Sequence, residues 1–196
     1  MKRNIGFYGG TFDPIHFGHI NLAIQLFEIH HLDEVLFCPA YCSPFKTAAL
    51  PHASPRHRLE MVRIALEEIP HFRITTYEIE RNDSSFTIDT LRTIKGETKG
   101  ELKFRLLLSE EAAAHFDQWK DFQELIHIAP PLIGTRSSRP LRKNLVDTLR
   151  SGFTQTKIFE ISSTDIRERL KKQLYCGHLV PGKVLDYIKT NGLYMK

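Results

Sequence analysis

Two glycines and two histidines near the start of the chain have the types and spacing of a phosphate-binding site. Gly9-Gly10 follows an apolar run that predicts a buried strand, and apolar residues then recur at helical spacing over Ile20–His30. A glycine turn between a strand and a helix lets the backbone approach an anion closely, and the helix start offers free N–H groups. His16 and His19 are three residues apart at that start, so both rings are expected on one face of the helix.

The same residues leave other interpretations open. Each histidine could be a polar loop residue, and the pair could bind a metal ion. The zinc-protease pattern, however, has two histidines four residues apart with a Glu between them, whereas this pair is three apart without a Glu. The glycines match neither the GxGxxG dinucleotide pattern nor a Walker A loop. The prediction for this segment is therefore a phosphate site with no protein metal ligands.

Composition and charge predict one globular α/β domain over residues 1–196. The hydrophobic share of 41% and the charged share of 26% are ordinary for such a domain. The net charge of +4 suits a small polyanion, and no basic run longer than two residues supports a nucleic-acid groove. The three cysteines are irregularly spaced, as in proteins of a reducing compartment, and the sequence shows no signal peptide, so we expect a cytoplasmic protein. No apolar run has the length of a membrane span, so we expect binding to neither membrane nor nucleic acid.

Apolar runs and helix signals alternate along the chain, and this alternation predicts a parallel sheet. Ser54-Pro55 opens a helix whose apolar stripe is predicted as Leu59, Val62, Leu66 and Ile69, with Arg56, Arg58 and Arg63 in solvent. Leu179-Val180-Pro181 opens a final helix that ends at Asn191-Gly192. The predicted strands are Ile5–Tyr8, Val35–Cys38, Phe72–Thr75, Leu102–Leu108, His127–Gly134 and Lys157–Ile161.

A second candidate anion site is the hydroxyl-rich segment Ser162-Ser163-Thr164, which precedes another predicted helix. Its hydroxyls and the helix start could face an anion together, with the Arg167 guanidinium one turn into the helix. The alternative is structural, because Ser162 and Asp165 have the spacing of a capping box before an apolar run. Two phosphate-type motifs near opposite ends of one chain indicate a phosphate ligand more strongly than either does alone.

The string GGTFDPIHFGH and the segment Ile-Ser-Ser-Thr-x-Ile-Arg resemble the two signatures of the HxGH nucleotidyltransferase superfamily. Over nearly its full length the chain is similar to bacterial nicotinate-nucleotide adenylyltransferases. The resemblance implies a Rossmann-like doubly wound parallel sheet of five to six strands with helices on both faces. It implies transfer of the ATP adenylyl group to nicotinate mononucleotide, in NAD biosynthesis, with Mg²⁺ bound mainly through ATP phosphates. It assigns His16, His19 and Arg167 to catalysis and Gly9, Gly10, Thr11, Phe12, Ile161, Ser162, Ser163 and Thr164 to ATP.

The same resemblance implies contacts to the mononucleotide. Thr87 would meet the pyridine carboxylate at a helix start, and the indole of Trp119 would stack on the pyridine ring. The structural alternatives are a helix cap at Ser84, Ser85 or Thr87 and a core position for Trp119. The full set of mononucleotide residues is Lys46, Thr87, Glu111, Trp119 and Arg136.

The chain departs from the family pattern at three places near these positions. Phe45 stands where the family has a His, and Phe86 stands where it has a Tyr. Ser109-Glu110 replaces a Gly-Ala pair. Because a Ser in place of a Gly restricts how closely the backbone can approach a ligand, the nucleotide contacts of this turn are the least defined.

Two other functions remain open at this point. Phosphopantetheine adenylyltransferases share both end motifs, but their chains are shorter and usually carry Thr-Asn-Gly-His where this chain has His16-Phe17-Gly18-His19. A non-catalytic nucleotide-binding module would not need the intact histidine pair and Arg167. The sequence leaves open whether the chain forms a homo-oligomer.

Overall fold

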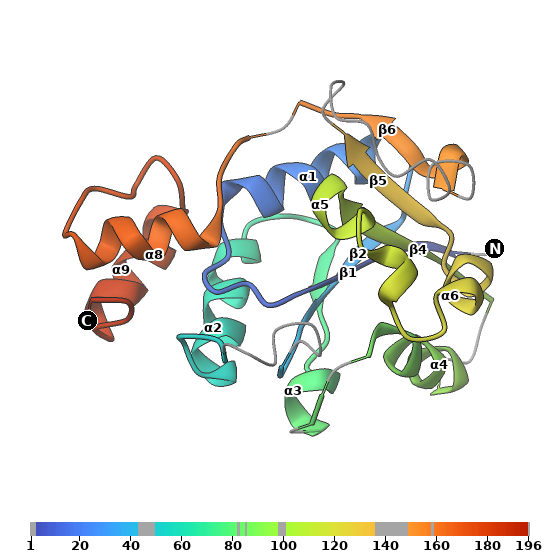
Figure 1. The fold of residues 1–196 in the computed structure, drawn as a ribbon, viewed down its shortest axis with the longest axis horizontal. Helices are drawn as coiled ribbons and strands as arrows, with labels where there is room; N and C mark the ends of the chain where they lie inside the picture. Colours follow the sequence, from blue (N-terminus) through green and yellow to red (C-terminus); the bar gives the residue numbers. More distant parts are fainter. Residues whose placement is uncertain are drawn as a thin grey trace. The chain divides into compact units, whose positions relative to one another are not determined.

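The computed structural model describes residues 3–42, 50–81, 83–84, 86–97, 101–135, 149–157 and 159–195. Strands and helices alternate along the chain, as the apolar runs predict (Figure 1). The chain divides into two compact units. The first comprises Met1–Gly9, Leu22–Leu36 and Phe86–Ile158, and the second comprises Gly10–Asn21, Phe37–Ser85 and Phe159–Lys196. That all 196 residues act as one domain stays a prediction.

Within the described residues, one sheet contains six strands: β1 (Arg3–Gly10), β2 (Glu34–Pro39), β3 (Phe72–Ile74), β4 (Leu102–Ser109), β5 (Pro131–Thr135) and β6 (Phe153–Gln155). Their order is β3-β2-β1-β4-β5-β6, which is that of a doubly wound, Rossmann-like sheet. The predicted α/β fold with a parallel sheet of five to six strands is confirmed. The order reverses between β1 and β4, and open α/β sheets bind ligands beyond the carboxyl ends of their strands at such a point.

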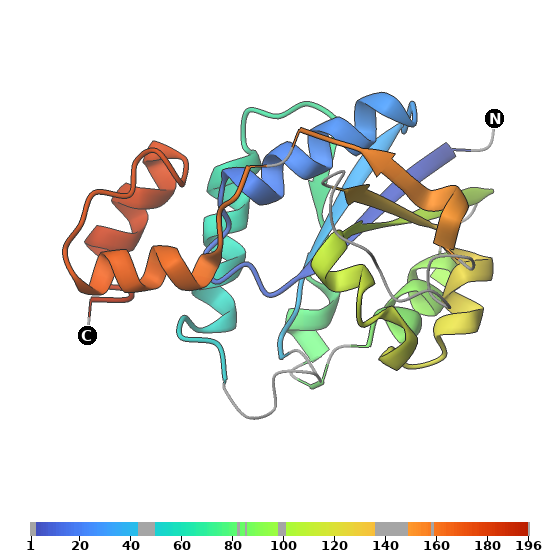
Figure 2. The same ribbon diagram turned by 45° about the horizontal axis from the view of Figure 1, so that its top comes forward.

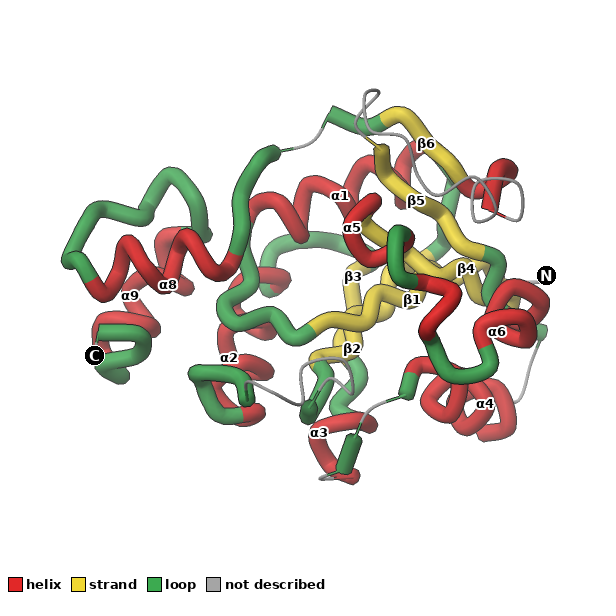
Figure 3. The backbone as a smooth tube through the Cα atoms, in the orientation of Figure 1, coloured by secondary structure: helices red, strands yellow, loops and turns green. Residues whose placement is uncertain are grey.

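The first unit is built on the parallel ladder from β1 through β4 and β5 to β6 (Figure 2). Phe7 pairs with Leu106, and Leu107 pairs with Leu132; all four side chains are buried, as in a sheet covered on both faces. Helices α4 (Thr87–Glu97) and α6 (Phe122–Ile128) lie side by side (Figure 3). The unit also contains α5 (Glu110–Ala113) and the short 3₁₀ helices η2 (Phe116–Gln118) and η3 (Arg150–Gly152).

The second unit holds α2 (Pro55–Leu66), α3 (Tyr77–Arg81), α8 (Ser163–Lys171) and α9 (Gly182–Thr190), and α2 packs on α9. Ser54 caps α2 by accepting a hydrogen bond from the His57 amide, with Pro55 at the first helical position, as predicted. Asn191 caps the C-terminal end of α9, and Gly192 follows with φ +60°, as the sequence predicts. Helix α1 (Phe17–Ile29) begins in this unit and continues into the first.

One predicted strand begins later than expected, and the last one lies elsewhere in the sequence. Residues His127 and Ile128 end helix α6, and strand β5 begins only at Pro131. The reason is visible in the burial of Leu125 and Ala129, which recur at the helical spacing of four. The last strand is Phe153–Gln155 and not Lys157–Ile161. The apolar side chain of Phe159 is 52% exposed, so this residue does not belong to the core.

The longest helix in the described ranges, α1, has 13 residues. None of the described helices has the length and apolar character that a membrane span requires.

Candidate active site

The His16–His19 pair forms a reciprocal cap at the start of α1. The Nδ1 atom of His16 accepts a hydrogen bond from the His19 amide, and Nδ1 of His19 accepts one from the His16 amide, both at 3.3 Å. The two rings stack with centroids 3.7 Å apart. A Cβ on Gly18 would lie 3.0 Å from the His16 ring, so the glycine between the histidines makes room for the stacked pair. The prediction that both rings share one face is confirmed.

The reciprocal cap also sets the protonation of the rings. Because each Nδ1 accepts a backbone N–H, each neutral ring carries its proton on Nε2. Burial lowers the pKa of His16 to about 4. In the ligand-free protein at neutral pH it is a neutral imidazole that offers one N–H donor, because a buried charge would lose its hydration.

The ring of Phe12 packs against Gly10 in the loop between β1 and α1. A Cβ on Gly10 would lie 2.8 Å from this ring, so Gly10 leaves the space that the ring fills. Phe12 is buried, has φ 50°, and meets the edge of the His19 ring at 5.1 Å between centroids. Two of the predicted ATP residues therefore act on the histidine pair: the Phe12 ring packs against His19, and Gly10 leaves room for the Phe12 ring.

The second motif meets the first within the second unit. Ser162 caps α8 by accepting a hydrogen bond from the Asp165 amide at 3.0 Å, which confirms the capping interpretation. The Ser163 hydroxyl donates to the Pro14 carbonyl at 3.0 Å. The chain thus brings residues about 150 positions apart into direct contact, and the start of α8 lies against the GTFDP loop.

The Arg167 guanidinium extends this junction. Its Nη1 donates to the Asp13 carbonyl at 2.7 Å, and its Nη2 donates to the Thr164 hydroxyl at 3.1 Å. The Arg167 side chain keeps 19% of its surface exposed. Arg167 is therefore held in place while part of it stays open to a ligand. Ile161 precedes the junction and donates its amide to the Phe159 carbonyl.

The sequence predicts that Arg58 lies in solvent, and this prediction is wrong, because the side chain is fully buried. Its guanidinium donates to the carbonyls of Thr11 and Ala40, both at 2.6 Å. Further bonds reach the carbonyls of Tyr41 at 2.8 Å and Ala53 at 3.3 Å. Burial lowers the pKa of Arg58, and the nearby Asp13 carboxylate partly opposes this shift.

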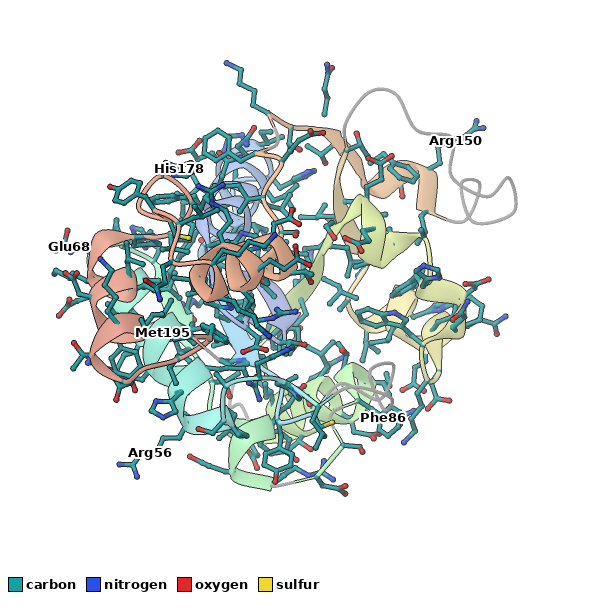
Figure 4. All side chains as sticks on the ribbon, turned by 60° about the vertical axis from the view of Figure 1, so that its left-hand side comes forward. Arg56, Glu68, Phe86, Arg150, His178 and Met195 are labelled. Atoms are coloured by element: carbon teal, nitrogen blue, oxygen red, sulfur yellow. The ribbon has the colours of Figure 1, made fainter. Side chains whose placement is uncertain are left out.

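The signal for Arg58 was present in the sequence. The side chains that α2 buries besides Arg58 are Met61, Val62 and Leu66, whereas Leu59 is only half-buried. Arg58 lies four residues before Val62, so helical spacing places it on the buried face. Arg56 on the same helix points away from the molecule, as predicted (Figure 4).

The first unit holds the mononucleotide residues that the structure describes. Thr87 begins α4, and its hydroxyl lies 4.0 Å from where a Cβ on Gly9 would be, so these two predicted residues lie together. Trp119 is half-buried, with its ring 5.3 Å from that of Phe116, which fits neither a pure core position nor full exposure. Glu111 is exposed. Lys46 and Arg136 lie outside the described residues.

The departure at Ser109 has a structural consequence. Ser109 ends β4 and caps α5 by accepting a hydrogen bond from the Ala112 amide at 3.2 Å. A glycine at this position could not make this bond, since it has no side chain. The substitution therefore fixes the start of a short helix at the carboxyl end of β4.

The sequence also does not indicate the contact between Lys120 and Asp89. Lys120 donates to the Asp89 carboxylate at 2.8 Å, and its ammonium lies 5.0 Å from the centre of the Phe86 ring. The residue next to Trp119 is thus attached to the start of the helix that carries Thr87.

Comparisons with known proteins agree with this architecture. The family described as Cytidylyltransferase-like matches residues 7–169. A probable nicotinate-nucleotide adenylyltransferase of Hydrogenobaculum sp. is 35% identical, with 98% of each chain covered. A protein of the same name from Methylacidiphilum infernorum is 34% identical over 97% of this chain and 92% of its own.

Solved structures share the fold. The Plasmodium falciparum nicotinic acid mononucleotide adenylyltransferase complexed with NaAD superposes with a TM-score of 0.79 at 20% identity, with 98% of this chain and 97% of that chain covered. Likeness at this identity concerns the fold alone, whereas the full-length relatives above 30% identity establish the family. The chain belongs to the cytidylyltransferase-like family and, within it, to the nicotinate-nucleotide adenylyltransferases.

Proposed function

We propose that the protein transfers the adenylyl group of ATP to nicotinate mononucleotide, which yields deamido-NAD and pyrophosphate in NAD biosynthesis. The observation that carries the proposal is the junction of the two signature motifs, where Arg167 and Ser163 bond the loop that leads into the His16–His19 pair. The full-length likeness to proteins named for this reaction supports it. Because the family match at residues 7–169 spans both compact units, we propose that residues 1–196 act as one domain.

The reaction is a displacement at phosphorus. A 5′-phosphate oxygen of the mononucleotide forms a bond to the α-phosphorus of ATP, while the bond from that phosphorus to the bridging oxygen breaks. Pyrophosphate leaves with the electron pair. The nucleophile is already an anion, so no general base is needed. The protein has to align several negative groups and stabilise the charge that develops on the leaving group.

The second unit supplies donors for this task. His16 and His19 each carry an Nε2 proton, and α1 and α8 each present a helix N-terminus. Arg167 supplies a permanent positive charge that is already oriented. The proposed ATP contacts are Gly9, which belongs to the first unit, and, from the second unit, Gly10, Thr11, Phe12, Ile161, Ser162, Ser163 and Thr164.

The first unit supplies the proposed pyridine contacts. The start of α4 at Thr87 offers N–H groups to the carboxylate, and Trp119 offers a half-exposed indole face. Glu111 and Arg136 of the same unit, and Lys46 of the second unit, remain proposed contacts of the mononucleotide.

We propose Mg²⁺ as the cofactor, held mainly by ATP phosphate oxygens. Among the described residues, no three His, Cys, Asp or Glu side chains gather in a way that could hold a metal ion. A donor set of imidazole, hydroxyl and guanidinium groups fits a cation that arrives on the phosphates and keeps much of its water. When bound, Mg²⁺ neutralises negative charge on the phosphate oxygens.

The decisive experiment measures pyrophosphate released from ATP and Mg²⁺ with nicotinate mononucleotide, nicotinamide mononucleotide or phosphopantetheine in separate reactions. We expect release with nicotinate mononucleotide. Release only with phosphopantetheine would replace the proposed acceptor. Absence of release with all three would leave the chain as a nucleotide-binding module and reject the proposed activity.

A further inference from the structure

The carboxylate of Asp13 is buried inside the first motif and has no role in the reaction described above. Asp13 is only 5% exposed. Its Oδ1 accepts hydrogen bonds from the Ala53 amide at 3.0 Å and the Tyr194 hydroxyl at 2.7 Å. Its Oδ2 accepts one from the His52 amide at 2.8 Å. A buried carboxylate with this many donors is fixed in position, because moving it would leave a charge unpaired.

Tyr194 comes from the tail that follows α9, where Figure 4 labels the neighbouring Met195. Burial and the Asp13 charge raise the pKa of Tyr194 well above its usual range, so the hydroxyl stays protonated and always donates. Tyr194 has φ 64°, a conformation that a non-glycine residue adopts only where its surroundings hold it. The end of the chain is thus bonded to the loop that precedes the histidine pair.

Asp13 in turn holds Arg167. The Asp13 carbonyl accepts the Nη1 hydrogen bond at 2.7 Å, and the same Nη1 lies 4.0 Å from Oδ2. On the other side of the loop, Arg58 bonds the Thr11 carbonyl. The short segment from Thr11 to Asp13 is therefore fixed by a buried cation at one end and by the tail hydroxyl at the other.

We propose that Tyr194 is a positioning residue for the triphosphate: its hydroxyl fixes Asp13, and Asp13 orients the Arg167 guanidinium. The inference rests on the proposed function, since Arg167 is the cation that the triphosphate would meet. Without the Tyr194 hydroxyl, the carboxylate loses one of its three described donors. It can then turn toward Nη1 and shorten the 4.0 Å separation to a direct ion pair. Such a pair would draw the guanidinium away from the ligand.

The test compares Tyr194→Phe with Tyr187→Phe. Tyr187 lies on α9, and its hydroxyl contacts Nδ1 of His57 at 2.9 Å, away from the segment Thr11–Asp13. The Tyr187→Phe variant is therefore a matched control, because it also removes one tyrosine hydroxyl. We expect Tyr194→Phe to lower kcat/KM for ATP about tenfold, the scale of one hydrogen bond to a charged group. KM for the mononucleotide should stay unchanged, and Tyr187→Phe should keep the wild-type constants.

A double-mutant cycle with Arg167→Ala separates positioning from a merely structural role. If Tyr194 acts through Arg167, its replacement should cost little further activity in the Arg167→Ala background. An equal fold-loss in both backgrounds, or wild-type kcat/KM for ATP in Tyr194→Phe, overturns the inference. Thermal unfolding of each variant identifies a loss that comes only from reduced stability. A wild-type protein that releases no pyrophosphate refutes the proposed function instead.

Discussion

The two compact units hold their candidate ligand groups by different means. In the second unit the polar groups around the proposed phosphate site are buried and bond mainly to the backbone: Arg58 has no exposed surface, and Asp13 and His16 are each 5% exposed. In the first unit the segments that carry Thr87 and Trp119 are joined by surface ion pairs. Arg92 contacts Asp121 and Glu124, and all three side chains are more than 40% exposed.

The difference implies a division of energetic roles. Removing one partner of a buried charged group leaves uncompensated carbonyls or charges and costs several kcal/mol, whereas exposed ion pairs contribute little and weaken in salt. The proposed reaction requires aligned phosphates in every turnover, and the residues proposed to align them are held by these costly contacts. The segments proposed to meet the pyridine nucleotide are joined by exposed ion pairs, and the chain also departs from the family pattern there, at Ser109 and Phe86. Variants on the two sides should therefore differ in size and kind of effect.

The largest effect on activity is expected at the histidine pair. His19→Ala removes an Nε2–H donor and the acceptor for the His16 amide, so turnover should fall roughly 10²–10³-fold, the scale of losing one stabilising donor. Steady-state kinetics measure it, with His127→Ala on the exposed surface of α6 as the control. Unchanged turnover in His19→Ala would contradict the proposed role and remove the central argument for the phosphate side.

The next effect concerns stability. Arg58→Met leaves the carbonyls of Thr11, Ala40 and Tyr41 without their donor in a buried place and should lower the free energy of unfolding by about 3–5 kcal/mol. Urea denaturation measures this loss. Arg63→Met on the same helix removes an exposed pair with Glu60 and should leave the midpoint nearly unchanged. Similar urea midpoints for the two variants would show that the buried hydrogen bonds of Arg58 stabilise the protein no more than the exposed Arg63–Glu60 pair does.

A pH dependence follows from His16. The pKa of His16 is about 4 in the folded protein and near 6.5 in the unfolded chain. Between pH 4 and pH 6.5 the imidazole is therefore protonated in the unfolded state and neutral in the folded state. Stability should therefore fall as the pH is lowered from 6.5 to 4, by up to roughly 3 kcal/mol from this residue. Unfolding measured across this window should show a shallower decrease in His16→Gln. An NMR titration of His16 with a midpoint near 6.5 would be the opposite result.

The sequence predicts what depends on local pattern. The strand before Gly9, the Ser162 and Ser54 caps and the helix end at Asn191 each follow from a few neighbouring residues, and the structure agrees. Apolar residues alone misplaced two strands: Phe159 is exposed and lies in no strand, and helix α6 still includes His127 and Ile128, where the predicted strand had already begun.

The long-range contacts could not be predicted from such patterns. Tyr194 and Asp13 are separated by 181 positions, and nothing in either local sequence indicates that their side chains meet. The burial of Arg58 could be predicted in part. Helical spacing places the residue on the buried face of α2, but its carbonyl partners come from other segments, which the local sequence does not indicate. The motifs therefore predict which residues meet the ligand, and only the fold reveals which residues hold them.

The smallest effect is expected on the pyridine side, from Lys120→Ala. This change removes the contacts of Lys120 with Asp89 and the Phe86 ring and loosens the Trp119 segment from the start of α4. Asp89 keeps Arg92 as a partner at 3.3 Å, so the loss should be modest: about a two- to fivefold rise in KM for the mononucleotide, with KM for ATP unchanged. Lys95→Ala, an exposed change in the last turn of α4, is the control. Because exposed pairs are screened, the difference between wild type and Lys120→Ala should shrink in 1 M salt. A loss as large as that of His19→Ala, or one that salt leaves intact, would mean that the pyridine side is held as firmly as the phosphate side.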